Sequence, residues 1–76
     1  MNKYKSHKTV YAGRIISIED GEVSYLELET GERFSVSYKW YTKHSPEVGG
    51  YFVQYEDGYE SYSPANAFEL GYTQEL

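Results

Sequence analysis

The amino-acid sequence predicts a mainly β domain: a five-stranded antiparallel meander that curls into a small SH3-like barrel, followed by a short C-terminal helix. Short stretches of β-branched and aromatic residues alternate with turns in which glycine stands next to acidic residues, a spacing typical of all-β domains. The chain has 76 residues and no cysteine, but it has ten tyrosines, three phenylalanines and one tryptophan. Aromatic side chains must therefore supply most of the core of what we expect to be a single small domain, residues 1–76.

The first half of the chain predicts three strands. Residues 1–8 are polar and basic, and we expect them to be flexible. Residues 9–18, 23–28 and 33–38 have the composition of strands and the spacing of a meander. In the first strand, period-two alternation puts four apolar side chains on one face: Val10, Ala12, Ile16 and Ile18. The two turns between these strands contain Gly21 and Gly31, which can adopt a positive φ.

The second half predicts a hairpin. Residues 51–55 and 59–62 have strand composition, and Asp57-Gly58 between them suits a primed two-residue turn.

Two short helices flank this hairpin. Ser37 is the expected N-cap of a single helical turn that Pro46 ends. Ser63 is the expected N-cap of the C-terminal helix, with Pro64 at its first position. Gly71 would end that helix in the left-handed conformation.

Composition excludes several classes of function. Twelve acidic residues against seven basic ones give a net charge of −5, which argues against direct nucleic-acid binding. Without cysteine there is no disulfide and no thiolate metal site. The sequence contains no apolar run of membrane-span length and no signal-peptide pattern. We expect a location in the cytoplasm, no membrane association, no metal and no cofactor.

The candidate catalytic groups are few. His44 beside Ser45 could act as a base, but a loop histidine that forms local hydrogen bonds is the commoner case. Glu56, Asp57 and Glu60 flank the hairpin turn, where acidic residues ordinarily face solvent and protect a sheet edge. We predict that the protein is not an enzyme.

Aromatic residues are the more informative candidates. The hairpin strands carry more tyrosines than one face can bury, so we expect some rings to face solvent. Tyrosine and tryptophan are frequent at binding hot spots. The sequence therefore predicts a binding surface made of six residues: Trp40, Tyr41, Tyr51, Tyr55, Tyr59 and Tyr62.

Residues 43–73 follow the pattern Lys-His-x-Pro-x-x-Gly-Gly-Tyr-x-Val-x-Tyr-x-Asp-Gly-Tyr-x-Ser-x-Ser-Pro-x-x-Ala-Phe-x-x-Gly-Tyr-Thr. This block resembles the C-terminal block of small, functionally uncharacterised proteins of tailed bacteriophages and prophages. The resemblance covers roughly the last 40% of the chain. It implies a phage origin, and therefore the cytoplasm of an infected bacterial host, and it assigns no catalytic residue.

The leading hypothesis is a non-enzymatic phage accessory protein that binds a host or phage protein through the aromatic residues, with counter-defence as one role. Self-association through an exposed strand edge also suits so small a core. One alternative is a protein that binds or sequesters nucleotides, in which rings stack on bases and Arg14, Lys39 and Lys43 meet phosphates. Another is an acidic mimic of DNA, suggested by the acidic stretch from Glu19 to Glu32.

Overall fold

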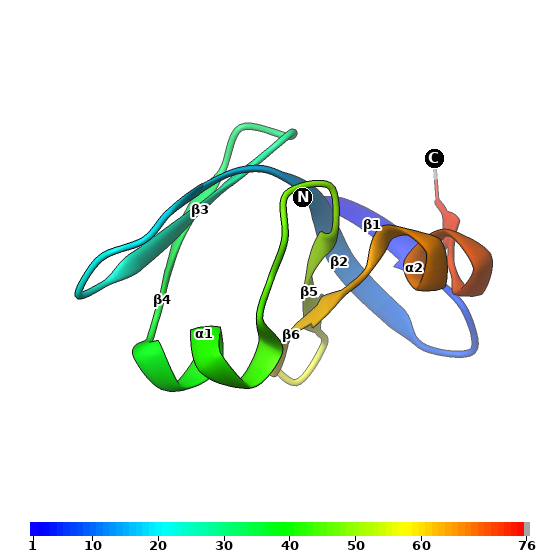
Figure 1. The fold of residues 1–76 in the computed structure, drawn as a ribbon. Helices are drawn as coiled ribbons and strands as arrows, with labels where there is room; N and C mark the ends of the chain where they lie inside the picture. Colours follow the sequence, from blue (N-terminus) through cyan, green and yellow to red (C-terminus); the bar gives the residue numbers. More distant parts are fainter. Residues whose placement is uncertain (76) are drawn as a thin grey trace.

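The computed structural model describes residues 1–75 as one antiparallel, strongly curled sheet with two short helices (Figure 1). The elements are, in chain order, β1 (Asn2–Lys5), β2 (Thr9–Glu19), β3 (Ser24–Leu28), β4 (Arg33–Val36), α1 (Tyr38–His44), β5 (Tyr51–Tyr55), β6 (Glu60–Ser63), α2 (Ala65–Gly71) and β7 (Thr73–Gln74). The strands β4, β3, β2, β1 and β7 follow one another in the sheet, while β5 pairs with β2 and β6 pairs with β5.

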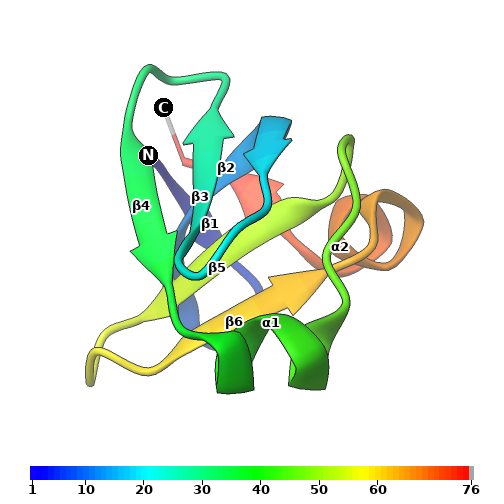
Figure 2. The same cartoon turned by 60° about the vertical axis from the view of Figure 1, so that its left-hand side comes forward.

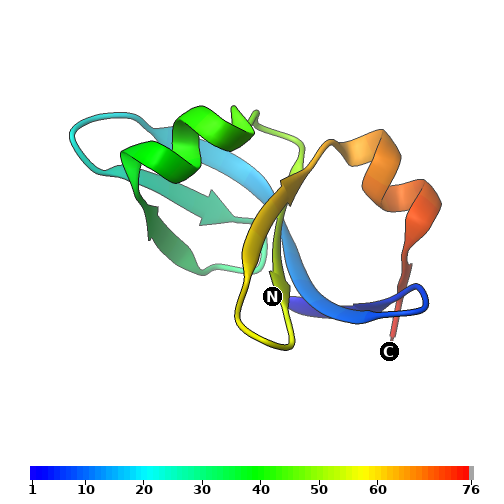
Figure 3. The ribbon, with the colours of Figure 1, turned by 90° about the horizontal axis from the view of Figure 1, so that it is seen from below.

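Strand β2 organises the fold because it pairs with three other strands. Its first residues pair with β1, the segment Val10–Arg14 pairs with β5, and the last residues pair with β3. A bulge lies between Ile15 and Ser17, and a bulge bends a strand and increases its twist. Figure 3 shows α1 with β3 and β4 on one side of the molecule and α2 with the N-terminal part of β2 on the other.

The predicted burial of β2 was wrong at Ile16. Strict alternation put Ile16 and Ile18 on the same face as Val10 and Ala12, whereas Ile15 is fully buried and Ile16 is exposed. Val10 and Ala12 enter one core cluster, and Ile15, on the opposite face of the strand, enters another. The bulge after Ile15 then brings Ile18 to the same side as Ile15. Gly13 lies just before the bulge, where a Cβ would come within 2.9 Å of the Leu28 side chain. Glycine therefore allows β2 to cross closely over the end of β3.

Two clusters of buried side chains make up the core. The first cluster consists of Val10, Ala12, Tyr51, Val53 and Phe68, and the second consists of Ile15, Leu26, Leu28, Val36 and Phe52. Because side chains alternate along a strand, Tyr51 and Val53 of β5 enter the first cluster while Phe52 enters the second. Helix α2 covers the first cluster through Phe68, and α1 covers the second through Trp40 and Tyr41.

These features confirm a mainly β, antiparallel, barrel-like fold with a short helix near its C-terminus. The SH3-like variety of that barrel stays a prediction. The cap of α1 is confirmed as well, because the Ser37 side chain accepts a hydrogen bond from the Trp40 N–H (3.1 Å). Gly31 and Gly58 have the expected positive φ, at 101° and 93°. The predicted primed two-residue turn was wrong, because Asp57 has no positive φ and the hairpin loop has three residues, 56–58, closed between Tyr55 and Tyr59. Gly21 is not among the residues of the described chain with positive φ, so that prediction was wrong.

The helix α2 begins and ends differently from the prediction. Ser63 remains in β6, paired with Tyr51, and its hydroxyl bonds to the Pro64 carbonyl instead of capping the helix. Pro64 takes the N-cap position with no side-chain cap bond. The helix ends at Tyr72, which is extended with φ −130°, and Gly71 does not adopt the left-handed conformation. The Tyr72 ring stacks on Phe68. This contact, and not a left-handed Gly71, accompanies the end of the helix.

The sheet has seven strands instead of five because both ends of the chain join it. The sequence predicted no strand in residues 1–8, yet β1 pairs with β2 on one side and with β7 on the other. Tyr4 explains why β1 is held, since its ring packs against the first cluster and meets Phe68 edge-on at 4.8 Å. Within residues 1–75, neither helix is long and apolar enough to cross a membrane.

Candidate binding surface

The six predicted site residues lie in different environments. Tyr51 is only 7% exposed and belongs to the first cluster, so its ring is not displayed to a partner. Trp40, Tyr41 and Tyr62 are half-buried against the second cluster. Tyr55 is half-buried, and Tyr59 is 46% exposed. The structure therefore separates Tyr51 from the group and leaves Tyr55 and Tyr59 at the centre of an exposed aromatic region.

The turn between β5 and β6 brings Tyr55 and Tyr59 together. The Tyr55 N–H donates to the Tyr59 carbonyl, and the Gly58 N–H donates back to the Tyr55 carbonyl (both 2.9 Å). The Asp57 carboxylate accepts from the Tyr59 N–H (2.9 Å), which makes the turn rigid. The two rings stack with centroids 5.5 Å apart and planes within 10°. Two tyrosines four residues apart thus form one preordered pair.

A lysine lies against each ring of this pair. Lys8 Nζ is 5.6 Å from the centroid of Tyr55, and Lys43 Nζ is 5.8 Å from the centroid of Tyr59. Lys43 also donates to the Tyr59 hydroxyl (3.3 Å). Such cation–π contacts at exposed sites contribute about 0.5–1 kcal/mol each. We use the name aromatic surface for Trp40, Tyr55 and Tyr59 together with Lys8 and Lys43.

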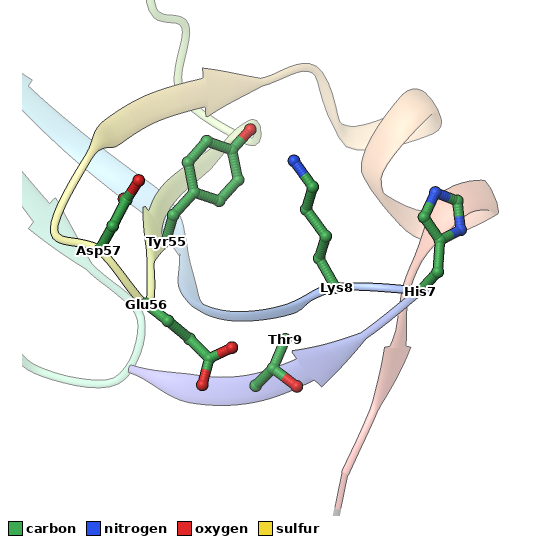
Figure 4. Close-up of a pocket in the computed structure, with 6 residues that line it drawn as sticks. All are labelled: His7, Lys8, Thr9, Tyr55, Glu56 and Asp57. Carbon is green, nitrogen blue, oxygen red and sulfur yellow. The ribbon is translucent and has the colours of Figure 1, made fainter.

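A shallow hollow borders the aromatic surface on the Lys8 side (Figure 4). Its volume is about 430 Å³, and it is lined by six residues: His7, Lys8, Thr9, Tyr55, Glu56 and Asp57. Figure 4 shows the Lys8 side chain extending toward the level of the Tyr55 ring, while His7 lies beyond Lys8, farther from that ring. The hollow is open to solvent and carries charges of both signs, so it resembles the rim of a protein interface more than an enclosed ligand pocket.

A groove lies on the opposite side of Tyr59, between α1 and the edge of β6, which stand side by side in Figures 1 and 2. Its volume is about 220 Å³, and it is lined by Ser37, Lys39, Trp40, Lys43, His44, Tyr59 and Glu60. We refer to it as the α1–β6 groove. The Trp40 indole N–H donates to the Glu60 carbonyl (3.0 Å), which fastens the helix to the edge of β6.

His44 lies against Trp40 and not in a catalytic arrangement. The two ring centroids are 4.7 Å apart with planes tilted by 42°. Burial, and secondarily the charge of Lys43, lower the pKa of His44 below its ordinary value of 6.5. The neighbouring Ser45 ends α1, its N–H donating to the Tyr41 carbonyl. Within residues 1–75, no group of three or more histidine or acidic side chains is placed to hold a metal ion.

Arg14 belongs to a structural network that sequence reasoning missed. Arg14 Nη2 donates to Tyr51 Oη (3.0 Å) and to Glu69 Oε2 (2.5 Å), while Nη1 donates to the Gly49 carbonyl (3.1 Å). The Tyr51 hydroxyl also donates to Glu69 (2.9 Å). The pKa of Arg14 is raised, mainly by the nearby Tyr51 and then by Glu69. The pKa of Tyr51 is also raised, mainly by burial and then by its hydrogen bond to Glu69. The network ties α2 to β2 and β5, so Arg14 has a structural role that sequence reasoning did not assign to it.

The whole fold was compared with known proteins. A scan against protein-family models gave no match, and a search of the curated proteins gave none. The search of solved structures found the monomeric form of the phage L decoration protein, determined by NMR in solution. The two structures superpose with a TM-score of 0.73 and 28% sequence identity over 93% of this chain. This chain is similar to a phage decoration protein.

The similarity supports the predicted resemblance to small phage proteins. The neighbour belongs to a phage, and its name describes decoration and not catalysis. The aligned region covers 57% of the phage L protein, so this chain spans little more than half of its length. The C-terminal sequence block itself is not tested by this comparison and stays a prediction.

Proposed function

We propose that this protein is a non-enzymatic phage accessory protein that decorates a capsid by binding the assembled shell. The observation that carries the proposal is the superposition of nearly the whole chain, 93%, on the phage L decoration protein with 28% identity. An identity of that size over 93% of this chain is more than a shared topology requires, since unrelated proteins also share folds.

The aromatic surface is the proposed contact region. Tyr59 and Tyr55 offer large, rigid rings that are already stacked in the free protein, so little side-chain entropy is lost on binding. Trp40 is held by its bond to the Glu60 carbonyl. Tyrosine, tryptophan and nearby polar side chains together give the composition of an interface hot spot with a polar rim.

Co-sedimentation with capsids tests this function. Purified protein is mixed with capsids of the phage or prophage that encodes it, and with phage L capsids that lack their own decoration protein. We expect saturable binding to the first capsid and a fixed number of copies per shell. Binding that does not saturate, or no binding to either capsid, would refute the proposal.

A matched pair of tyrosine variants tests the surface. Tyr59→Ala removes the exposed ring of the stacked pair, and we expect capsid affinity to fall about 30-fold, equivalent to about 2 kcal/mol for a hot-spot residue. Tyr38→Ala is the control, because Tyr38 is 75% exposed on α1 and does not line the α1–β6 groove. Equal losses of affinity in the two variants would show that this surface is not the contact region.

The other functional predictions from the sequence stand apart from this proposal. A counter-defence role, self-association and the cytoplasm of an infected bacterial host as the location remain predictions. No specific contact favours the nucleotide-binding alternative over decoration, and Arg14 is occupied by Glu69. The acidic-mimic alternative has no further support, because Glu19 and Glu29 form ion pairs with Arg33 and Arg14.

A further inference from the structure

The α1–β6 groove has the dimensions of a side-chain site. Its volume of about 220 Å³ is below the roughly 300–1,000 Å³ typical of small-molecule pockets. Trp40 and Tyr59 form its apolar surface, and both are held in place, Trp40 by the Glu60 carbonyl and Tyr59 by stacking on Tyr55. A groove of this kind accepts one or two side chains of an extended segment.

The charge of the groove differs from the charge of the chain. Lys39 and Lys43 line it, and neither forms an ion pair with a carboxylate among residues 1–75, in contrast to Lys3, Arg14 and Arg33. The Lys43 ammonium instead lies against the Tyr59 ring. Glu60 is the carboxylate among the lining residues. With His44 neutral, two lysines against one glutamate give the groove a charge of 2 − 1 = +1, whereas the whole chain has −5.

We infer that the α1–β6 groove binds an extended acidic segment of the partner protein. An apolar side chain of that segment lies over Trp40 and Tyr59, and an adjacent carboxylate meets Lys39 and Lys43. Charge complementarity selects this occupant: an acidic segment is repelled by most of the surface of an acidic protein and attracted to this groove. The inference rests on the proposed function in one respect, namely that the partner is the protein of the capsid shell.

The single tryptophan of the chain provides the assay, because Trp40 lines the groove. The probe is the acetylated, amidated peptide Glu-Asp-Phe-Asp-Glu, titrated into the full chain while tryptophan emission is recorded. The neutral peptide Gln-Asn-Phe-Asn-Gln is the matched control ligand. We expect a saturable change of emission with the acidic peptide, and at least tenfold weaker binding of the neutral one, because charge-assisted hydrogen bonds are lost.

Two lysine variants locate the site. The double variant Lys39→Gln/Lys43→Gln should bind the acidic peptide at least tenfold more weakly than the unmodified protein does. Lys5→Gln is the control, since Lys5 is exposed on β1 and does not line the groove. Circular dichroism verifies that both variants are folded. Equal binding of the two peptides, equal effects of the two variants, or no change of emission at millimolar peptide would overturn the inference.

Competing occupants give different results. Adenosine monophosphate that changes the emission at lower concentration than the peptide would assign the groove to nucleotides and overturn the inference. A change of emission with protein concentration alone would assign the groove to a second copy of the chain, with the same consequence. If Lys39→Gln/Lys43→Gln binds the capsid as well as the unmodified protein does, the groove inference is wrong and the decoration proposal stands. If the protein binds the acidic peptide but not the capsid, the decoration proposal is wrong and peptide binding by the groove stands.

Discussion

Replacing Phe68 with alanine tests whether the two core clusters and α2 form one cooperative unit. Phe68 is buried and is surrounded by rings: Tyr51 stacks on it at 4.2 Å, Tyr72 at 4.6 Å, and Tyr4 meets it edge-on at 4.8 Å. A buried Phe→Ala change costs about 3–5 kcal/mol. A domain of 76 residues has a total stability of about 4–11 kcal/mol. Phe68→Ala should therefore remove at least about a quarter of the stability.

The assay is urea unfolding followed by far-ultraviolet circular dichroism and by tryptophan emission. Trp40 lies against the second cluster, whereas Phe68 lies in the first, so the two signals report on both halves. We expect both transitions to shift together, with a fall in melting temperature of at least about 12 °C. Leu70→Ala is the control, because Leu70 is on the same helix but 90% exposed, and it should change stability by less than about 0.5 kcal/mol.

Two results would refute this reasoning. A loss below about 1 kcal/mol in Phe68→Ala would mean that α2 contributes little to the core. A shift of the dichroism transition without a shift of the Trp40 transition would mean that the clusters unfold separately.

Three further predictions concern local features. Gly58→Val should lower stability by about 1–2 kcal/mol because φ is positive there, and a thermal melt beside Gly21→Val, whose φ is not positive, should show the larger loss at Gly58. Ser63→Ala should change the free energy of unfolding by less than about 0.5 kcal/mol, because this serine does not cap α2. A loss near 1 kcal/mol would show that Ser63 does act as the cap. Burial, and secondarily the charge of Lys43, hold the pKa of His44 in the folded protein below 6.5. The unfolded chain therefore binds more protons, and stability falls as the pH drops below about 6.5. In His44→Gln, the free energies of unfolding at pH 7 and pH 5 should differ by less than in the unmodified protein.

The features that the sequence predicted well are those set by neighbouring residues. The position of the hairpin turn was predicted correctly, although its type was not: Gly58 supplies one positive φ and the Asp57 carboxylate accepts from the Tyr59 N–H. Ser37 caps the start of α1, and Ser45, in the left-handed conformation, ends the helix. Such contacts depend on local chemistry, and the rest of the fold cannot easily override them.

The features that the sequence did not reveal depend on distant partners. β1 is a strand because β2 and β7 pair with it and because Tyr4 meets Phe68, 64 positions later in the chain. Ile15 is buried because the second cluster lies on the face of β2 opposite to Val10 and Ala12, and the bulge after Ile15 brings Ile18 to that same face. Alternation along one strand does not reveal a second cluster on its other face. Ser63 and Pro64 have the residues of a capped helix start, yet pairing with Tyr51 keeps Ser63 in β6.

The candidate site was predictable in composition but not in arrangement. Which tyrosines face solvent is decided by α2, which covers Tyr51 through Phe68 and leaves Tyr55 and Tyr59 outside. The lysines on these rings come from segments far away in the chain, Lys8 before β2 and Lys43 at the end of α1. No periodicity within β5 and β6 could indicate them.

Electron cryomicroscopy of capsids saturated with the protein tests the central claim most directly. We predict regularly spaced density on the shell in which the β5–β6 turn and the α1–β6 groove face the capsid and the Tyr59 ring is buried at the contact. Density in which that face points to solvent, while α2 or the acidic turn after β2 touches the shell, would contradict the account.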